Sequence, residues 1–224
     1  EAARRRAPSD PVPRIDALTR IARNTWFAQL AALLFFGLTL MGFRHIDFFD
    51  ATRAVTLPLV NTPVATRLFF FFAPAIVTAS YCYLHLYLIR LWDALGEADP
   101  KHKGAPLARI IAPWLVTDAA LFLRRRLGGE DGHAVHGENE RVERAAAIVN
   151  LLLTWGFGIL VLHGAVLAVL PIRNPALTVA TLGPLLDACF FGAASLRRWL
   201  QVIETRTRSG RAVRWMRNAS VAFL

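Results

Sequence analysis

The sequence predicts an all-α polytopic membrane protein with four transmembrane helices. Four apolar stretches, at about residues 26–43, 68–89, 146–170 and 177–196, match or nearly match the roughly 20 residues that a helix needs to cross a bilayer. Lys and Arg are distributed unevenly around these stretches. The chain is also 55% hydrophobic, with a mean hydropathy of +0.40. These observations favour one membrane domain over a soluble domain with a single anchor.

The distribution of positive charge predicts an orientation. With the N-terminus in the cytoplasm, 22 of the 26 Lys and Arg residues lie on the cytoplasmic side of the predicted spans. The other four are Arg44, Arg53, Arg67 and Arg173. Because basic residues concentrate on the cytoplasmic side of membrane proteins, we expect both termini to be cytoplasmic.

Residues 1–25 form a basic segment ahead of the first span. The first residues are rich in proline and arginine, which favours an extended chain, whereas Ile15 to Thr25 is expected to form a short helix that runs into the span. The segment lacks the charged, apolar and cleavage regions of a secretory signal. Three tryptophans at predicted cytoplasmic span ends are expected at the lipid headgroups: Trp26, Trp92 and Trp199.

The outer loop contains turn-forming residues, and two cysteines lie within the predicted spans. Pro58, Asn61 and Pro63 predict turns between the first two spans. Cys82, in the second span, and Cys189, in the fourth, are expected to be packing residues and not a disulfide.

The cytoplasmic loop, residues 90–145, is the largest predicted polar segment. Within it, Pro113 to Arg126 is expected to form a short helix with an apolar face. One interpretation is an interfacial helix whose Arg124, Arg125 and Arg126 meet anionic headgroups. The alternative is a helix packed against the cytoplasmic ends of the spans. His133 and His136 lack companion ligands nearby, so no metal site is predicted.

The third and fourth spans are expected to form an antiparallel hairpin, because only residues 171–176 connect them. His163 and Asp187 lie in these spans, at depths of roughly 10 and 15 Å from the outer surface. Ionisable residues within a membrane are candidates for function. A His–Asp pair is suited to proton or ion movement, but we favour an interhelical hydrogen bond that holds the hairpin. Pro184 interrupts the fourth span, which is a feature of some transport sites but also ordinary in membrane helices. The small residues Gly158 and Gly192 permit close helix packing.

His85 is the third intramembrane candidate. It is predicted to lie near the cytoplasmic end of the second span, roughly 6 Å below the surface. That depth differs too much from the depth of His163 for the two to be the axial ligands of one haem. Ligation of a pigment, haem or metal by a single histidine remains an alternative to a hydrogen bond with a neighbouring helix. The leading expectation is that the protein binds no cofactor.

Residues 197–224 form a tail rich in arginine. Arg197, Arg198 and Trp199 follow the fourth span directly and are expected to bind anionic lipid or a protein partner. Nucleic acid is not expected as a partner, because only the positive charge favours it.

Four phrases together resemble the N-terminal membrane region of bacterial pentapeptide-repeat-containing membrane proteins. They are RIDALTRIARNTWFAQL at 14–30, DFF at 47–49, YCYLHLYLIRLWDAL at 81–95 and PWLVTDAALFLRRRL at 113–127. The resemblance implies a module of the bacterial inner membrane, with a repeat domain on the cytoplasmic side of longer members. No run of such repeats occurs before Leu224, so a function based on repeats is not carried over.

The sequence contains no nucleophile, metal or nucleotide motif that predicts an enzyme. We expect a non-enzymatic inner-membrane protein that anchors, scaffolds or assists a larger assembly of other membrane subunits or of its own copies. One alternative is an oligomeric channel or transporter that uses His163 and Asp187. Another is an auxiliary subunit of a photosynthetic or respiratory complex, with His85 or His163 touching a pigment or haem.

Overall fold

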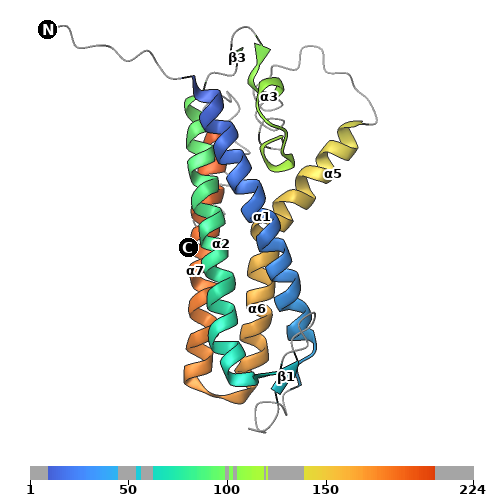
Figure 1. Ribbon diagram of the computed structural model, residues 1–224, viewed down its shortest axis with the longest axis vertical. Coiled ribbons are helices and arrows are strands. Elements are labelled where there is room, and N and C mark those ends of the chain that lie inside the picture. Colours follow the sequence, from blue (N-terminus) through green and yellow to red (C-terminus); the bar gives the residue numbers. More distant parts are fainter. Residues whose placement is uncertain are drawn as a thin grey trace, which may run out of the picture.

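Four long helical segments pack side by side in the computed structural model (Figure 1). It describes residues 10–44, 54–56, 63–98, 101–102, 105–118, 120 and 139–204. The segments that are long and apolar enough to cross a membrane are Pro11–Met41, Thr66–Glu97, Ala145–Ile172 and Pro175–Val202. The predicted all-α fold with four membrane helices is therefore confirmed.

The first, second and fourth segments are single helices: α1 (Pro11–Met41), α2 (Thr66–Glu97) and α7 (Pro175–Glu204). The third is composite. It contains α5 (Asn139–Leu151), the π-helical turn η2 (Leu152–Gly156), α6 (Phe157–Val169) and the 3₁₀ turn η3 (Leu170–Ile172).

The helices follow a simple order around the bundle. α1 packs beside α2, α2 beside α7, α7 beside α6, and α6 beside α1. A short connection joins η3 to α7, where Arg173 adopts a left-handed conformation with φ of 54°. The Asn174 side chain accepts hydrogen bonds from the backbone N–H groups of Ala176 and Leu177, at 3.1 and 3.3 Å. This cap starts α7, and the predicted antiparallel hairpin is confirmed. We call this end of the bundle the hairpin end.

The helices extend beyond the predicted spans at the opposite end, which we call the terminal end. α1 starts at Pro11, capped by Asp10, whose carboxylate accepts from the N–H of Val12 at 3.1 Å. The predicted short helix before the first span is thus the beginning of α1. α2 continues past Ile89 to Glu97 because Leu91 and Leu95 remain buried in the bundle.

Two small antiparallel ladders were not expected from the sequence. β1 (Ala54–Thr56) pairs with β2 (Pro63–Ala65), with Ala54 opposite Ala65. β3 (Lys101–His102) pairs with β4 (Ala105–Pro106). The prolines and Asn61 correctly indicated a reversal of the chain in the outer loop, but not the pairing on either side of it.

The segment after β4 packs against the bundle. It begins with α3 (Leu107–Ile110), and Trp114 then contacts Trp26 of α1 edge to face, with ring centroids 6.5 Å apart. The N–H of Ala112 donates to the Asp16 carboxylate of α1 at 2.8 Å. The described part of the expected interfacial helix therefore follows the alternative interpretation, a segment packed on the helix ends. Arg124, Arg125 and Arg126 lie outside the described residues.

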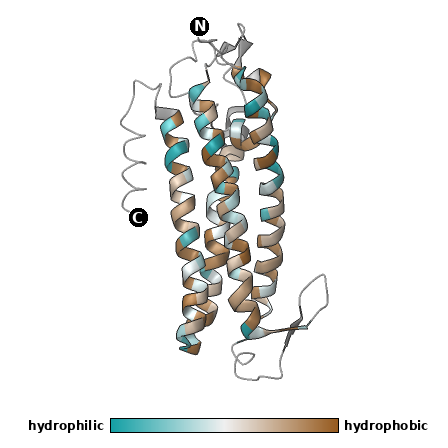
Figure 2. Ribbon diagram, turned by 60° about the vertical axis from the view of Figure 1, so that its left-hand side comes forward, coloured by the Kyte–Doolittle hydropathy of each residue, from teal (hydrophilic) through white to brown (hydrophobic). Residues whose placement is uncertain are grey.

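The bundle interior has two parts. The part toward the hairpin end is largely aliphatic and phenylalanine-rich, whereas the part toward the terminal end gathers tryptophans, and hydrophilic residues become more frequent there (Figure 2). The buried tryptophans of this part are Trp26, Trp92, Trp114, Trp155 and Trp199. The expectation that Trp26, Trp92 and Trp199 face lipid headgroups was wrong, because continued helix packing encloses their side chains.

Candidate functional site

The three intramembrane candidates predicted from the sequence lie in two different environments. One group is buried between the helices and centres on His85. The other, His163 and Asp187, lies on the outer surface of the bundle. The two groups have different chemical consequences, because a buried polar group finds its partners inside the protein and a membrane-facing one does not.

His85 is fully buried, with 0% exposure, and bonds across to α7. Its Nδ1 lies 2.9 Å from Oγ of Ser195, and the Trp155 indole N–H donates to the same oxygen at 3.1 Å. The predicted bond to a neighbouring helix is therefore present. The sequence placed His85 near the end of its predicted span at Ile89, but α2 continues to Glu97, so His85 lies about 18 Å along the helix from its end.

Tyr81 lies one turn from His85 and joins the same group. Its hydroxyl donates to the carbonyl oxygen of Trp155 at 3.0 Å, and its ring packs on His85 with centroids 4.1 Å apart. Two glycines make room for this ring. A Cβ built on Gly158 would lie 2.6 Å from the Tyr81 ring, and one on Gly192 would lie 2.8 Å from its hydroxyl. The predicted close helix packing at these two glycines is confirmed.

The π-helical turn η2 connects these contacts to α1. The Trp26 indole N–H donates to Oγ1 of Thr154 at 3.0 Å. A π-helical turn is wider than an α-helical one and is often found where a helix accommodates a functional or packing constraint. Through Thr154 and Trp155, η2 forms hydrogen bonds with α1, α2 and α7. We call the six residues that make these bonds the polar cluster: Trp26, Tyr81, His85, Thr154, Trp155 and Ser195.

The His85 ring is closely packed within the polar cluster. The His85 ring is enclosed by Tyr81 and Trp155, at centroid distances of 4.1 and 5.9 Å. Its Nε2 has no hydrogen-bond partner of good geometry among the described residues, although the Thr154 main chain lies close to the ring. Within the described ranges, no group of three His, Cys, Asp or Glu side chains is placed to hold a metal ion.

His163 projects from α6 on the side away from α1. Each residue rotates an α-helix by about 100°, so His163 is turned by about 100° from Gly164 and by about 160° from Val161. Both of these residues face α1: Gly164 approaches Leu40, and Val161 approaches Gly37. The His163 side chain is exposed on the remaining, outer side of α6.

Asp187 is also exposed, but on the α2 side of α7. Arg198 lies eleven residues later, about three turns along the same face, and forms an ion pair with Asp93 of α2 at 3.5 Å. Asp187 also interacts electrostatically with Cys82 of α2. His163 and Asp187 therefore lie on opposite sides of α7, His163 on the α6 side and Asp187 on the α2 side. Among the described residues, the two side chains form no contact with each other within one chain.

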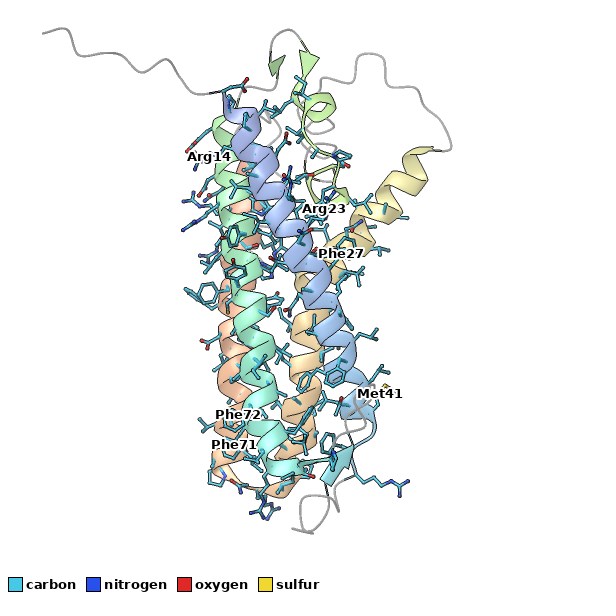
Figure 3. All side chains as sticks on the ribbon, viewed as in Figure 1. Arg14, Arg23, Phe27, Met41, Phe71 and Phe72 are labelled. Carbon is cyan, nitrogen blue, oxygen red and sulfur yellow. The ribbon has the colours of Figure 1, made fainter. Side chains whose placement is uncertain are left out.

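Exposed apolar side chains are frequent on the outer surface of the bundle. Phe27, Met41 and Phe72 project away from the bundle (Figure 3), and Leu186 and Phe190 do so next to Asp187. Such a surface suits lipid chains, whereas a charged carboxylate at the bilayer centre costs about 2.5–3.5 kcal/mol. Asp187 therefore marks a place where lipid is an unfavourable neighbour.

The residues expected to bind lipid at the end of the fourth span are engaged within the protein. Arg198 bonds to Gln201 at 3.1 Å as well as to Asp93. Trp199 is buried, with its ring centroid 6.0 Å from that of Trp155. Arg197 is partly buried, and its Nε has no hydrogen-bond partner among the residues that the structure describes. Residues 205–224 of the arginine-rich tail lie outside the described residues.

Sequence reasoning missed Ser195, Trp155 and Tyr81 as partners of His85. The spacing of Tyr81 and His85, one helical turn apart, was an available signal. Trp155, which lies between Thr154 and Gly156 in a largely aliphatic span, was another. The partnership of Ser195 depends on how α2 and α7 align, which no local pattern reveals.

A scan against protein-family models and searches of curated proteins and of solved structures found no match to this chain. The resemblance to pentapeptide-repeat membrane proteins stays a prediction. Function is inferred from the geometry of the bundle.

Proposed function

We propose that this chain is a non-enzymatic membrane subunit that anchors or scaffolds a larger assembly in the bacterial inner membrane. The observation that carries the proposal is the outward position of Asp187 on an apolar surface within a membrane-spanning helix. Contact with another membrane-embedded protein segment gives this carboxyl group a hydrogen-bond partner and removes it from lipid. Formation of this contact is the role in assembly that we propose for the chain.

The depth of Asp187 strengthens this argument. Pro175 starts α7 at the hairpin end, and Asp187 lies about 18 Å further along, close to the middle of the 28-residue span. An acidic side chain near a span end can extend to water, but one at this depth cannot reach it readily. A protein neighbour is the more favourable environment.

The polar cluster suits a scaffold because it fixes the helices relative to one another. Hydrogen bonds from η2 join α1, α2 and α7 in the interior. A rigid bundle presents its outer surface in one arrangement. Binding of a partner then does not carry the free-energy cost of ordering that surface.

The orientation proposed for this subunit has both termini in the cytoplasm. α1 begins and α7 ends at the same end of the bundle, and in the sequence 22 of the 26 Lys and Arg residues lie before residue 26, within 90–144 or after residue 196. The positive-inside rule then favours a cytoplasmic terminal end. Partners on the cytoplasmic side would meet the helix ends, the 90–145 loop and the tail.

Purification from native membranes in a mild detergent tests the proposal. The tagged chain is expected to migrate above its own mass on native gels, together with other membrane-protein copies. Asp187→Leu is expected to reduce this association, whereas Tyr83→Leu, which removes an exposed polar side chain of α2, is the matched control. A lone monomer for the unmodified chain, with no change caused by Asp187→Leu, would contradict the proposal.

A further inference from the structure

We propose that the neighbour of Asp187 is a second copy of this chain, packed through α7 about a two-fold axis normal to the membrane. In this dimer, His163 of each copy faces Asp187 of the other. The inference rests on the proposed function and specifies its partner.

The arrangement follows from the positions of the two residues on either flank of α7. His163 lies on the outer side of α6, away from α1, and Asp187 lies on the α2 flank of α7. The helix order places α7 between α6 and α2. The exposed ridge of α7 between the two residues is apolar and includes Val179, Leu186 and Phe190.

A two-fold axis brings the two different sides of α7 face to face in the dimer. When two copies meet ridge to ridge in the same orientation, the α6 side of one copy lies opposite the α2 side of the other. In an isologous contact each interaction between the copies occurs twice. Each His163 is then opposite an Asp187, so two hydrogen-bonded or ionic His–Asp pairs flank one apolar contact.

The depths of the two residues are compatible with this pairing. His163 lies about 14 Å along the helix from Ile172, and Asp187 about 18 Å along α7 from Pro175. Both reference residues are at the hairpin end, and a rotation about the membrane normal leaves depth unchanged. The offset is less than one helical turn, which the two side chains can span.

Gly183 provides an independent reason to expect a close neighbour at this surface. Gly158 and Gly192 are explained by Tyr81, but a Cβ built on Gly183 would meet no heavy atom of the chain within 4 Å. Gly183 lies one turn from Asp187 on α7. A glycine lowers helix propensity, yet it allows the backbone of another membrane helix to approach closely.

Exchange of the two side chains tests the pairing. The first variant carries Asp187→His, so its homodimer would place histidine opposite histidine. The second carries His163→Asp, so its homodimer would place aspartate opposite aspartate. A mixed dimer restores both His–Asp pairs. Because both positions are exposed, neither substitution disturbs the interior, and intrinsic tryptophan fluorescence verifies the fold.

The readout is disulfide crosslinking at the ridge. Leu186→Cys is introduced into each variant after Cys82→Ala and Cys189→Ala, and the two differently tagged chains are co-expressed. Mixed dimers are expected to exceed each homodimer by about tenfold, because each homodimer lacks two interhelical polar contacts. Ile76→Cys on α2 is the control and should form no such crosslink.

Two outcomes would overturn the inference. Equal yields of mixed dimers and homodimers would contradict the pairing of His163 with Asp187. Absence of the Leu186→Cys crosslink in the otherwise unsubstituted chain, while other membrane proteins still co-purify in an Asp187-dependent way, would overturn the dimer but keep the proposed function. Absence of both crosslinking and co-purification would overturn both.

Discussion

Gly158→Ala measures how tightly the polar cluster is packed. The new Cβ would lie 2.6 Å from both Cδ2 and Cε2 of Tyr81, whereas non-bonded carbons prefer about 3.5–4.0 Å. The ring would have to move by about 1 Å. Its hydroxyl is held by the Trp155 carbonyl at 3.0 Å, and Gly192 lies close beside that hydroxyl, so this movement is resisted. We expect a loss of about 2–3 kcal/mol in the free energy of unfolding, within the range for overpacked cores.

Denaturation by SDS in bicelles, followed by tryptophan fluorescence, measures this loss. Gly164→Ala is the matched control on the same helix, because its Cβ would lie 3.9 Å from Leu40, an ordinary contact. The cost of Gly158→Ala should also disappear in a Tyr81→Ala background, since the two changes share one contact. A cost below about 0.5 kcal/mol, the usual range for surface changes, would refute the packing described for Tyr81.

Substitutions at two further positions test hydrogen bonds between segments of the protein. Ser195→Ala leaves the Trp155 indole and His85 without their shared partner and should destabilise the bundle by about 1–2 kcal/mol, with a smaller loss for Ser195→Cys; equal unfolding curves would contradict the bonds. Asp16→Ala removes the acceptor for the Ala112 N–H, so hydrogen exchange at residues 111–118 should accelerate. Asp16→Asn keeps an oxygen acceptor and should exchange slowly, and identical rates in both variants would rule out this anchor.

The four helices and the hairpin were predictable because span length and loop length constrain them directly. The continuation of α2 beyond Ile89 was not, because Leu91 and Leu95 alternate with charged residues and no longer form a membrane-length apolar run. Packing against the rest of the bundle keeps that stretch helical. The same packing draws Trp92 inward.

The candidate residues were identified because they are ionisable groups inside predicted spans, but their neighbours depend on rotation about each helix axis. His163 and Asp187 have similar depths, and the sequence alone favoured a bond between them. The order of the helices places them on opposite flanks of α7. His85 shows the converse case: its bond to Ser195 needs the alignment of two helices far apart in the chain, and the π-helical turn adds a local shift that periodicity does not reveal.

The most direct test of an assembly role is lipid access to α7 in native membranes. Spin labels are attached through Leu186→Cys or Ile76→Cys in the chain with Cys82→Ala and Cys189→Ala. Leu186 and Ile76 are 60% and 67% exposed on the single chain, and both lie about 15–17 Å from the hairpin-end start of their helices. If protein covers the Asp187 surface, oxygen relaxes the Leu186 label much less than the Ile76 label. Equal relaxation at the two sites would contradict the account.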